Sequence, residues 1–262
     1  MLRVNIVEII PNKEPAMEKL NLDNIRQDIR KIIEPYLCKL LDIHKDNIVS
    51  ILLYGSATGK FYIPKQSDIN LMIVLNSLFF DELRLSLKLV NQGIRKKITA
   101  PLFLSLEHIQ TSKDVFPVEF LEIKENNILL YGRDLFKNMD IDLKHVRLFC
   151  EREIKGKLIR LRQAYLEVGL KKKGIEALLK ESLNSLLPIF RALIRLKGQS
   201  PDVDKFIVLK DAGELYGVDK GLFEAILKDK MNDEKIAGQA VEIFFEKYLD
   251  QIKKLALIID KL

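Results

Sequence analysis

The sequence predicts an α/β (α+β) domain with a short mixed sheet, followed by an all-α helical bundle domain. Up to about residue 142, apolar runs of strand length alternate with segments of helical periodicity, and beyond it every apolar segment has helical spacing. Hydrophobic residues make up 48% of the 262 residues, enough to bury a substantial core. We therefore expect one domain at residues 1–142 and a second at residues 143–262, without a flexible linker.

The first domain is expected to combine helices with short strands. Apolar residues recur at helical spacing over residues 23–41, with Pro35 inside, and over residues 80–98. β-Branched and apolar runs predict strands over residues 48–54, 69–75, 101–106 and 116–124. Leu129-Leu130-Tyr131-Gly132 closes this region, and a short helix is expected near Leu135.

The second domain is expected to be a bundle of four or five helices. Amphipathic segments predict helices over residues 143–168, 174–196, 202–216, 222–228 and 234–262, with a kink at Pro188. Residues 143–262 contain 24 Lys and Arg against 18 Asp and Glu, whereas residues 1–142 contain 19 of each. The net charge of +6 therefore lies in the second half, as a surface that attracts phosphate or an acidic partner, or as a solvated lysine-rich face.

Composition also argues against several classes of protein. No apolar run reaches the roughly 18 residues of a membrane span, and Met1 to Pro11 lacks the features of a signal peptide. Cys38 and Cys150 form no CxxC pair, so we expect no structural zinc and a cytoplasmic protein with reduced cysteines. The basic run at residues 171–173 has no interleaved aromatic residues, so we expect no nucleic-acid partner. Because no apolar run has membrane length, we also expect no membrane partner.

Leu53-Tyr54-Gly55-Ser56 is interpreted as an apolar strand that ends in a glycine-serine turn. Glycine lets backbone N–H groups approach a phosphate closely, and Ser56 adds a hydroxyl donor. The alternative is an ordinary tight turn. Residues 55–60 do not form a P-loop, because only three residues separate the glycines and Phe61 follows Lys60.

Ser67-Asp68-Ile69-Asn70 opens the next predicted strand. Alternate residues of a strand face one side, so Asp68 and Asn70 should point together while Ile69 points into the core. Asp68 suits Mg²⁺, which prefers oxygen ligands shared with substrate phosphates, whereas Asn70 offers only a neutral oxygen. The alternative for Asp68 is a polar residue that caps the start of the strand.

Glu119 and Glu122 supply acidic residues in the predicted strand over residues 116–124. They are three residues apart, so in a strand they would face opposite sides of the sheet. One of them could join Asp68 and Asn70 on one face, and the other would be solvated. A plain strand with solvated acids is the alternative.

Taken together, the Leu-Tyr-Gly-Ser and Ser-Asp-Ile-Asn-Leu elements and their spacing resemble the DNA polymerase beta-like nucleotidyltransferase superfamily, and within it the small bacterial aminoglycoside-type enzymes. The resemblance covers roughly residues 48–124. Val118-Glu119-Phe120-Leu121 is similar to the context of the third acid in that group, which favours Glu119 over Glu122. A helical domain after the catalytic domain is also common there.

The resemblance implies transfer of a nucleoside monophosphate, AMP from ATP in the first instance, to a hydroxyl-bearing acceptor. Asp68, Asn70 and Glu119 would be the catalytic and metal-binding residues, with Mg²⁺ or Mn²⁺ as the metal. The nucleotide would contact Gly55, Ser56, Lys60, Lys65 and Ser67, although both lysines also fit a plain solvated loop.

One residue departs from the pattern, because Asn70 stands where an Asp is expected. Loss of a metal-binding carboxylate weakens both metal binding and activation of the acceptor. The alternative function is therefore a catalytically impaired nucleotide-binding protein or a protein-interaction module on the same fold. The sequence leaves the acceptor unidentified, as a small molecule or a protein, and leaves a homodimer open.

Overall fold

The computed structural model describes residues 20–59, 62–64, 67–236 and 241–262. The chain divides into two compact units. The first consists of Met1–Thr111 and Glu122–Met139, and the second consists of Ser112–Leu121 and Asp140–Leu262.

The first unit contains a four-stranded mixed sheet, which confirms the predicted fold class. Its strands are β1 (Ile48–Tyr54), β2 (Asn70–Leu75), β3 (Leu102–Ser105) and β4 (Asn127–Gly132). Their order in the sheet is β3-β2-β1-β4. The central strand β1 runs antiparallel to both β2 and β4, whereas β2 and β3 are parallel.

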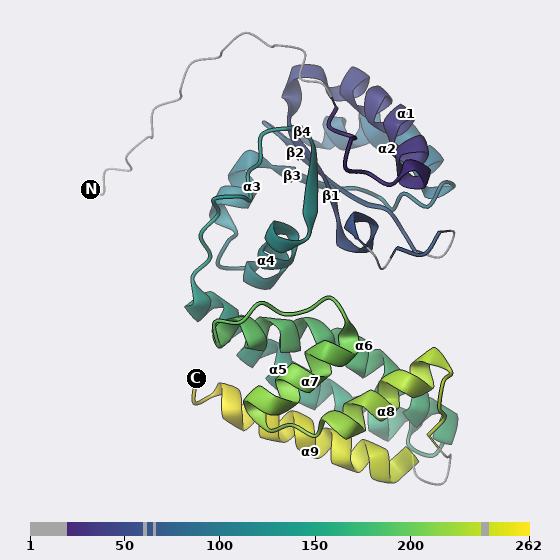
Figure 1. Ribbon diagram of the computed structural model, residues 1–262, viewed down its shortest axis with the longest axis vertical. Helices are drawn as coiled ribbons and strands as arrows, with labels where there is room; N and C mark the ends of the chain where they lie inside the picture. Colours follow the sequence, from purple (N-terminus) through teal and green to yellow (C-terminus); the bar gives the residue numbers. More distant parts are fainter. Residues whose placement is uncertain (1–19, 60–61, 65–66, 237–240) are drawn as a thin grey trace, which may run out of the picture. The chain divides into compact units, whose positions relative to one another are not determined.

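Two helices, α1 (Gln27–His44) and α2 (Phe80–Ile94), lie side by side against the sheet (Figure 1). Ile69, Leu71 and Ile73 belong to the same buried cluster as Ile33 and Leu37 of α1. Because side chains alternate along a strand, Asp68 and Asn70 lie on the opposite face of the sheet from this cluster. The core beneath α1 and α2 thus fixes which face carries the polar residues.

The segment predicted as a fourth strand, residues 116–124, is instead the helix α4 (Pro117–Glu125). Pro117 is its first residue, where the missing backbone N–H costs nothing. The edge of β1 that such a strand would need is already paired with β4, which begins earlier than the predicted 129–132 segment. The strand prediction for residues 116–124 is therefore wrong, and Glu119 and Glu122 lie on a helix.

Three smaller differences concern short elements. The helix expected near Leu135 does not form, because the described residues 133–142 contain only turns, bends and irregular backbone. A short helix, α3 (Leu106–Thr111), follows β3 and was not predicted. Single turns of 3₁₀-helix precede and follow β1, namely η1 (Lys45–Asn47) and η2 (Gly55–Thr58).

The described part of the second unit contains five helices of 12 residues or more, in line with the four or five helices that the apolar periodicity predicts. They are α5 (Leu143–Val168), α6 (Lys172–Leu196), α7 (Lys205–Tyr216), α8 (Lys220–Met231) and α9 (Val241–Ile259). Helix α6 contacts all the other four and contributes the largest set of buried residues. The side chains of Asp142, Asp204 and Asp219 accept hydrogen bonds from backbone N–H groups in the first turns of α5, α7 and α8. In the part of the chain that the structure describes, no helix is both long and apolar enough to cross a membrane.

Candidate functional site

The glycine-serine turn forms where β1 ends, and its first residue has to be glycine. Gly55 has a φ of +76°, which L side chains rarely adopt. A Cβ atom there would also lie 3.1 Å from Nδ2 of Asn70. The backbone N–H of Gly55 donates to the carbonyl oxygen of Asn126 at 3.4 Å. The turn is therefore pressed against the start of β2 on one side and the start of β4 on the other.

The turn continues as a single 3₁₀ turn with its own hydrogen bonds. Thr58 Oγ1 donates to the carbonyl oxygen of Gly55 at 2.8 Å, and the Gly59 N–H donates to that of Ser56 at 3.3 Å. Ala57 is buried and anchors the turn, while Ser56 is exposed. A hollow of about 460 Å³ opens beside the turn, lined by Asn24, Arg26, Ala57, Thr58 and Gly59.

Asp68 and Asn70 flank the fully buried Ile69 at the start of β2. The side chain of Asp68 is 56% exposed, whereas Asn70 is half-buried. Thr99 Oγ1 donates to Oδ1 of Asn70 at 3.0 Å, and the Thr99 N–H donates to the carbonyl oxygen of Ile69 at 3.1 Å. Thr99 thus holds the amide of Asn70 so that its Nδ2 faces Gly55.

The residues beside Asn70 across the sheet carry no charge. Tyr54 pairs with Asn70 on β2 and with Asn127 on β4, so the three side chains share one face in a row. Burial raises the pKa of the Tyr54 hydroxyl and keeps it neutral. Nδ2 of Asn127 donates to the carbonyl oxygen of Ile123 at 2.8 Å, at the end of α4. Asp68 is therefore the carboxylate next to an otherwise neutral row.

A lysine reaches toward that carboxylate. Nζ of Lys97 lies 3.9 Å from Oδ1 of Asp68. Lys97 ends the turn after α2 with a φ of +67°, where the Ile98 N–H donates to the carbonyl oxygen of Gly93 at 3.0 Å. Glycine is the usual residue at this position of a helix end, because other residues are strained there. The chain therefore holds a lysine, with its charge beside Asp68, at a position that favours glycine.

The donor atoms near Asp68 suit one metal ion rather than two. Among the described residues, no group of three or more His, Cys, Asp or Glu side chains could hold a metal. The Asp68 carboxylate and Oδ1 of Asn70 offer a charged and a neutral oxygen. Mg²⁺ is often held by one carboxylate together with waters and substrate phosphates, so this pair fits a single ion of that kind.

The remaining predicted residues have different placements. Glu119 is exposed on the part of α4 that belongs to the second unit, so its pairing with Asp68 stays a prediction. Oγ of Ser67 accepts from the Ile63 N–H at 2.9 Å and closes the loop before β2. Lys60 and Lys65 lie outside the described residues.

Sequence reasoning missed Tyr54, Lys97, Thr99 and Asn127 as neighbours of the predicted residues. Lys97 belongs to a basic cluster that suits a helix C-terminus, and nothing in its local sequence points to Asp68. Asn127 precedes the expected end segment at residues 129–132. The strand register, which pairs residues far apart in sequence, brings Tyr54 and Asn127 beside Asn70. Lys97 and Thr99 reach the start of β2 through the turn after α2 and the bridge between Ile69 and Ile98.

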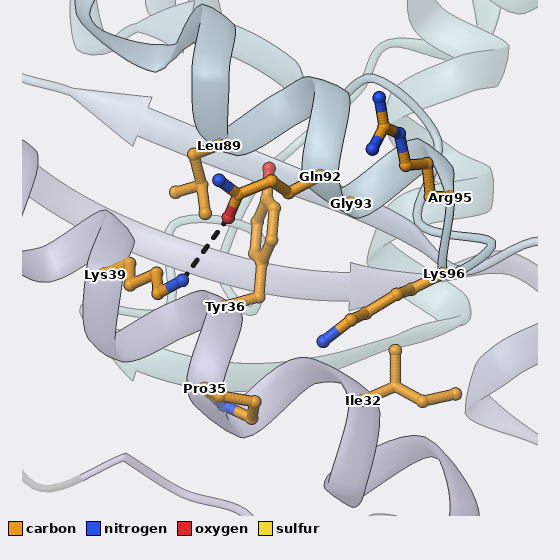
Figure 2. A pocket seen from close by; sticks show the side chains of 9 residues that line it. All are labelled: Ile32, Pro35, Tyr36, Lys39, Leu89, Gln92, Gly93, Arg95 and Lys96. Atoms are coloured by element: carbon orange, nitrogen blue, oxygen red, sulfur yellow. Dashed lines mark hydrogen bonds between the residues drawn. The ribbon is translucent and has the colours of Figure 1, made fainter.

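A second pocket lies on the opposite side of the sheet, between α1 and α2. It has a volume of about 230 Å³, and its apolar wall includes Ile32, Tyr36 and Leu89 (Figure 2). Nζ of Lys39 donates to Oε1 of Gln92 across it at 3.3 Å. Burial raises the pKa of the Tyr36 hydroxyl to about 12. The pocket is separate from the face that carries Asp68.

Comparison with solved structures identifies the fold. The structure is similar to that of a spectinomycin adenyltransferase from Enterococcus faecialis, solved with ATP and spectinomycin, with a TM-score of 0.54. The likeness covers 86% of this chain and 99% of that one at 13% sequence identity, and it establishes a nucleotidyltransferase fold followed by a helical part. No protein-family model and no curated protein sequence matches the chain.

Proposed function

We propose that this chain binds a nucleoside triphosphate, ATP in the first instance, and transfers its nucleoside monophosphate to a hydroxyl-bearing acceptor. The observation that carries the proposal is the contact between the Gly55 turn and the start of β2, which bears Asp68. A glycine turn with a positive φ, which lets backbone N–H groups approach phosphates, thus contacts Asn70, two residues after the exposed Asp68. The similar structure, an adenyltransferase solved with ATP, supports the same class of reaction.

Several groups of the chain would bind the triphosphate together. Backbone N–H groups of the turn and the exposed hydroxyl of Ser56 would donate to phosphate oxygens. Asp68 and the amide oxygen of Asn70 would hold one Mg²⁺ or Mn²⁺ ion, which neutralises phosphate charge when bound. Ser67 Oγ accepts from the Ile63 N–H, and its own O–H would donate to a phosphate oxygen.

We include Lys97 in the proposed nucleotide site. Because Asn70 stands where an Asp is expected, the site has one negative charge fewer. It would then hold one metal ion rather than two. The ammonium group of Lys97 supplies a positive charge 3.9 Å from Asp68. We assign to it a contact with a phosphate oxygen, in the position where a second cation would act.

The transfer itself is a substitution at the α-phosphorus. The acceptor oxygen forms a bond to that phosphorus, the bond to the bridging oxygen of the β-phosphate breaks, and pyrophosphate leaves. The acceptor's proton passes to a base, for which Glu119 remains the proposed residue. Positioning of the acceptor then supplies a large part of the rate.

A second function, nucleotide binding without turnover, is favoured by a different observation. Asn70 stands where an Asp is expected, and its neighbours across the sheet, Tyr54 and Asn127, are also neutral. A protein of this kind would keep the turn and Asp68 but would lack activation of the acceptor. It could act as a nucleotide-dependent interaction module on the same fold.

One experiment separates the two functions. The protein is incubated with labelled ATP, Mg²⁺ or Mn²⁺ and a panel of hydroxyl-bearing acceptors, and pyrophosphate release is measured. The transferase proposal expects acceptor-dependent release by wild type that Asp68→Ala abolishes. Release only from Asn70→Asp, with MgATP binding by wild type, would overturn transfer in favour of binding alone.

A further inference from the structure

Helix α2 has an apolar surface that is much wider than the part packed against its own unit. Its buried positions are Ser86, Leu89 and Gly93, which face α1 and the sheet. A second apolar face, the α2 stripe, lies beside this packed face and consists of Phe80, Leu83, Leu87, Val90 and Ile94. Phe80 is 75% exposed and Leu87 is 63% exposed. A helix that only covers a sheet needs one such face.

The spacing of the α2 stripe is that of a helix–helix interface. Its members are separated alternately by three and four residues, which is the heptad spacing of the a and d positions in paired helices. The polar residues Arg84, Lys88 and Asn91 lie beyond the stripe on the far side of the helix. The stripe therefore forms one continuous seam between the packed core and the solvated face.

The α2 stripe is also nearly symmetric about its central residue. Phe80 and Ile94 each lie seven residues from Leu87, and Leu83 and Val90 lie four and three residues from it. Two copies of α2 that run antiparallel would place Phe80 against Ile94, Leu83 against Val90, and Leu87 against itself. Such a self-complementary patch is what a two-fold interface requires.

The charges at the ends of α2 favour the antiparallel arrangement. The first turn carries Asp81 and Glu82, whereas the turn after the helix carries Arg95 and Lys96. An antiparallel pair brings the acidic end of one copy beside the basic end of the other, and it opposes the two helix dipoles. A parallel pair would place like charges together at both ends.

We propose that the α2 stripe is the interface of a homodimer in which two α2 helices pack antiparallel about a two-fold axis at Leu87. The occupant of the exposed apolar face is thus a second copy of this chain. The interface lies within the first unit and on a different surface from Asp68. Its test, the oligomeric state, does not depend on the proposed function.

Sedimentation equilibrium of the full chain tests this proposal with a matched pair of variants. Leu87→Lys places two ammonium groups face to face on the axis, and Leu85→Lys makes the same change on the same helix away from the stripe. Both leucines are exposed, at 63% and 60%, so neither change empties the core. Wild type and Leu85→Lys should be dimers. The dissociation constant of the Leu87→Lys dimer should be at least about 10-fold higher.

Mixing two variants tests the two-fold axis itself. Leu87→Lys and Leu87→Glu should each be monomeric, but an equimolar mixture should form a dimer, because residue 87 then faces an opposite charge. Wild type that stays monomeric up to about 100 μM would overturn the proposal. So would a Leu87→Lys variant that stays dimeric, or a mixture that fails to associate.

Discussion

The amino group of Lys97 lies 3.9 Å from the carboxylate of Asp68. Lys97 reaches this position from a backbone with a φ of +67°, which costs a non-glycine residue roughly 1–2 kcal/mol. The ion pair does not offset this strain, because both side chains are more than half exposed and exposed pairs stabilise by about 0–1 kcal/mol. Stability alone therefore does not explain the lysine, which supports a role in binding.

Replacement of Lys97 tests that role, because stability and binding should respond differently. Lys97→Gly should leave the free energy of unfolding within about 1 kcal/mol of wild type, since relief of strain offsets the lost ion pair and the added chain entropy. The same variant should bind MgATP about 10-fold more weakly in calorimetry, because a phosphate loses its cation.

Two controls accompany this measurement. Lys97→Arg keeps the charge and should keep most of the affinity, and Lys96→Ala removes a neighbouring exposed charge and should leave the affinity unchanged. Equal affinity in wild type and Lys97→Gly would show that Lys97 does not contact the nucleotide.

The turn at Gly55 should tolerate no side chain. Gly55→Ala combines a φ of +76° with a Cβ 3.1 Å from Nδ2 of Asn70, so we expect a loss of about 1–2 kcal/mol in urea denaturation. Gly59→Ala is the matched control, because its φ is −146° and, apart from its chain neighbours, no heavy atom of the described residues lies within 4 Å of its Cβ. A loss at Gly59 as large as at Gly55 would mean that the turn geometry is assigned wrongly.

Much of the fold follows from the sequence, because local apolar patterns are strong. The run Ile48 to Tyr54 forms β1 with the predicted bounds, and the second-half periodicity yields α5 to α9. Residues 116–124 were assigned wrongly because a short apolar run fits a strand or a helix equally well. Because β4 occupies the edge of β1, residues 116–124 do not form a strand there. This pairing joins residues far apart in the sequence.

The candidate site could be predicted only in part for the same reason. The positions of Gly55 and Asp68 follow from a strand end and a strand start, which local sequence reveals. The neutral row of Asn70, Tyr54 and Asn127 depends on the register of three strands. Lys97 is brought to Asp68 by a turn with a left-handed residue, a conformation that lysine disfavours. The local sequence therefore does not predict this turn.

A pH dependence of stability is expected from Lys157 in the second unit. Its ammonium group is buried and donates to the carbonyl oxygen of Ser182 at 3.2 Å and to Oγ of Ser185. Burial lowers the pKa of Lys157 from 10.5 to about 8. Between these values Lys157 binds more protons in the unfolded chain than in the folded chain, so its contribution to the free energy of unfolding should rise with pH.

Lys157→Met should remove this rise. Chemical denaturation from pH 7 to pH 9.5 measures the free energy of unfolding at each pH. This range lies below the pH at which tyrosines of the unfolded chain ionise, near pH 10. The stability difference between Lys157→Met and wild type should shrink as the pH increases, because burial of the lysine becomes less costly once it is neutral. A difference that is constant over this range would mean that Lys157 keeps its ordinary pKa.

The central claim, that the Gly55 turn and Asp68 form a metal-dependent nucleotide site, is tested most directly by calorimetric titration with MgATP. Wild type should bind, and Asp68→Ala should bind at least about 10-fold more weakly in Mg²⁺. Asp42→Ala, which removes an exposed carboxylate on α1, should bind like wild type. Full MgATP affinity in Asp68→Ala, or no binding by wild type, would contradict the claim.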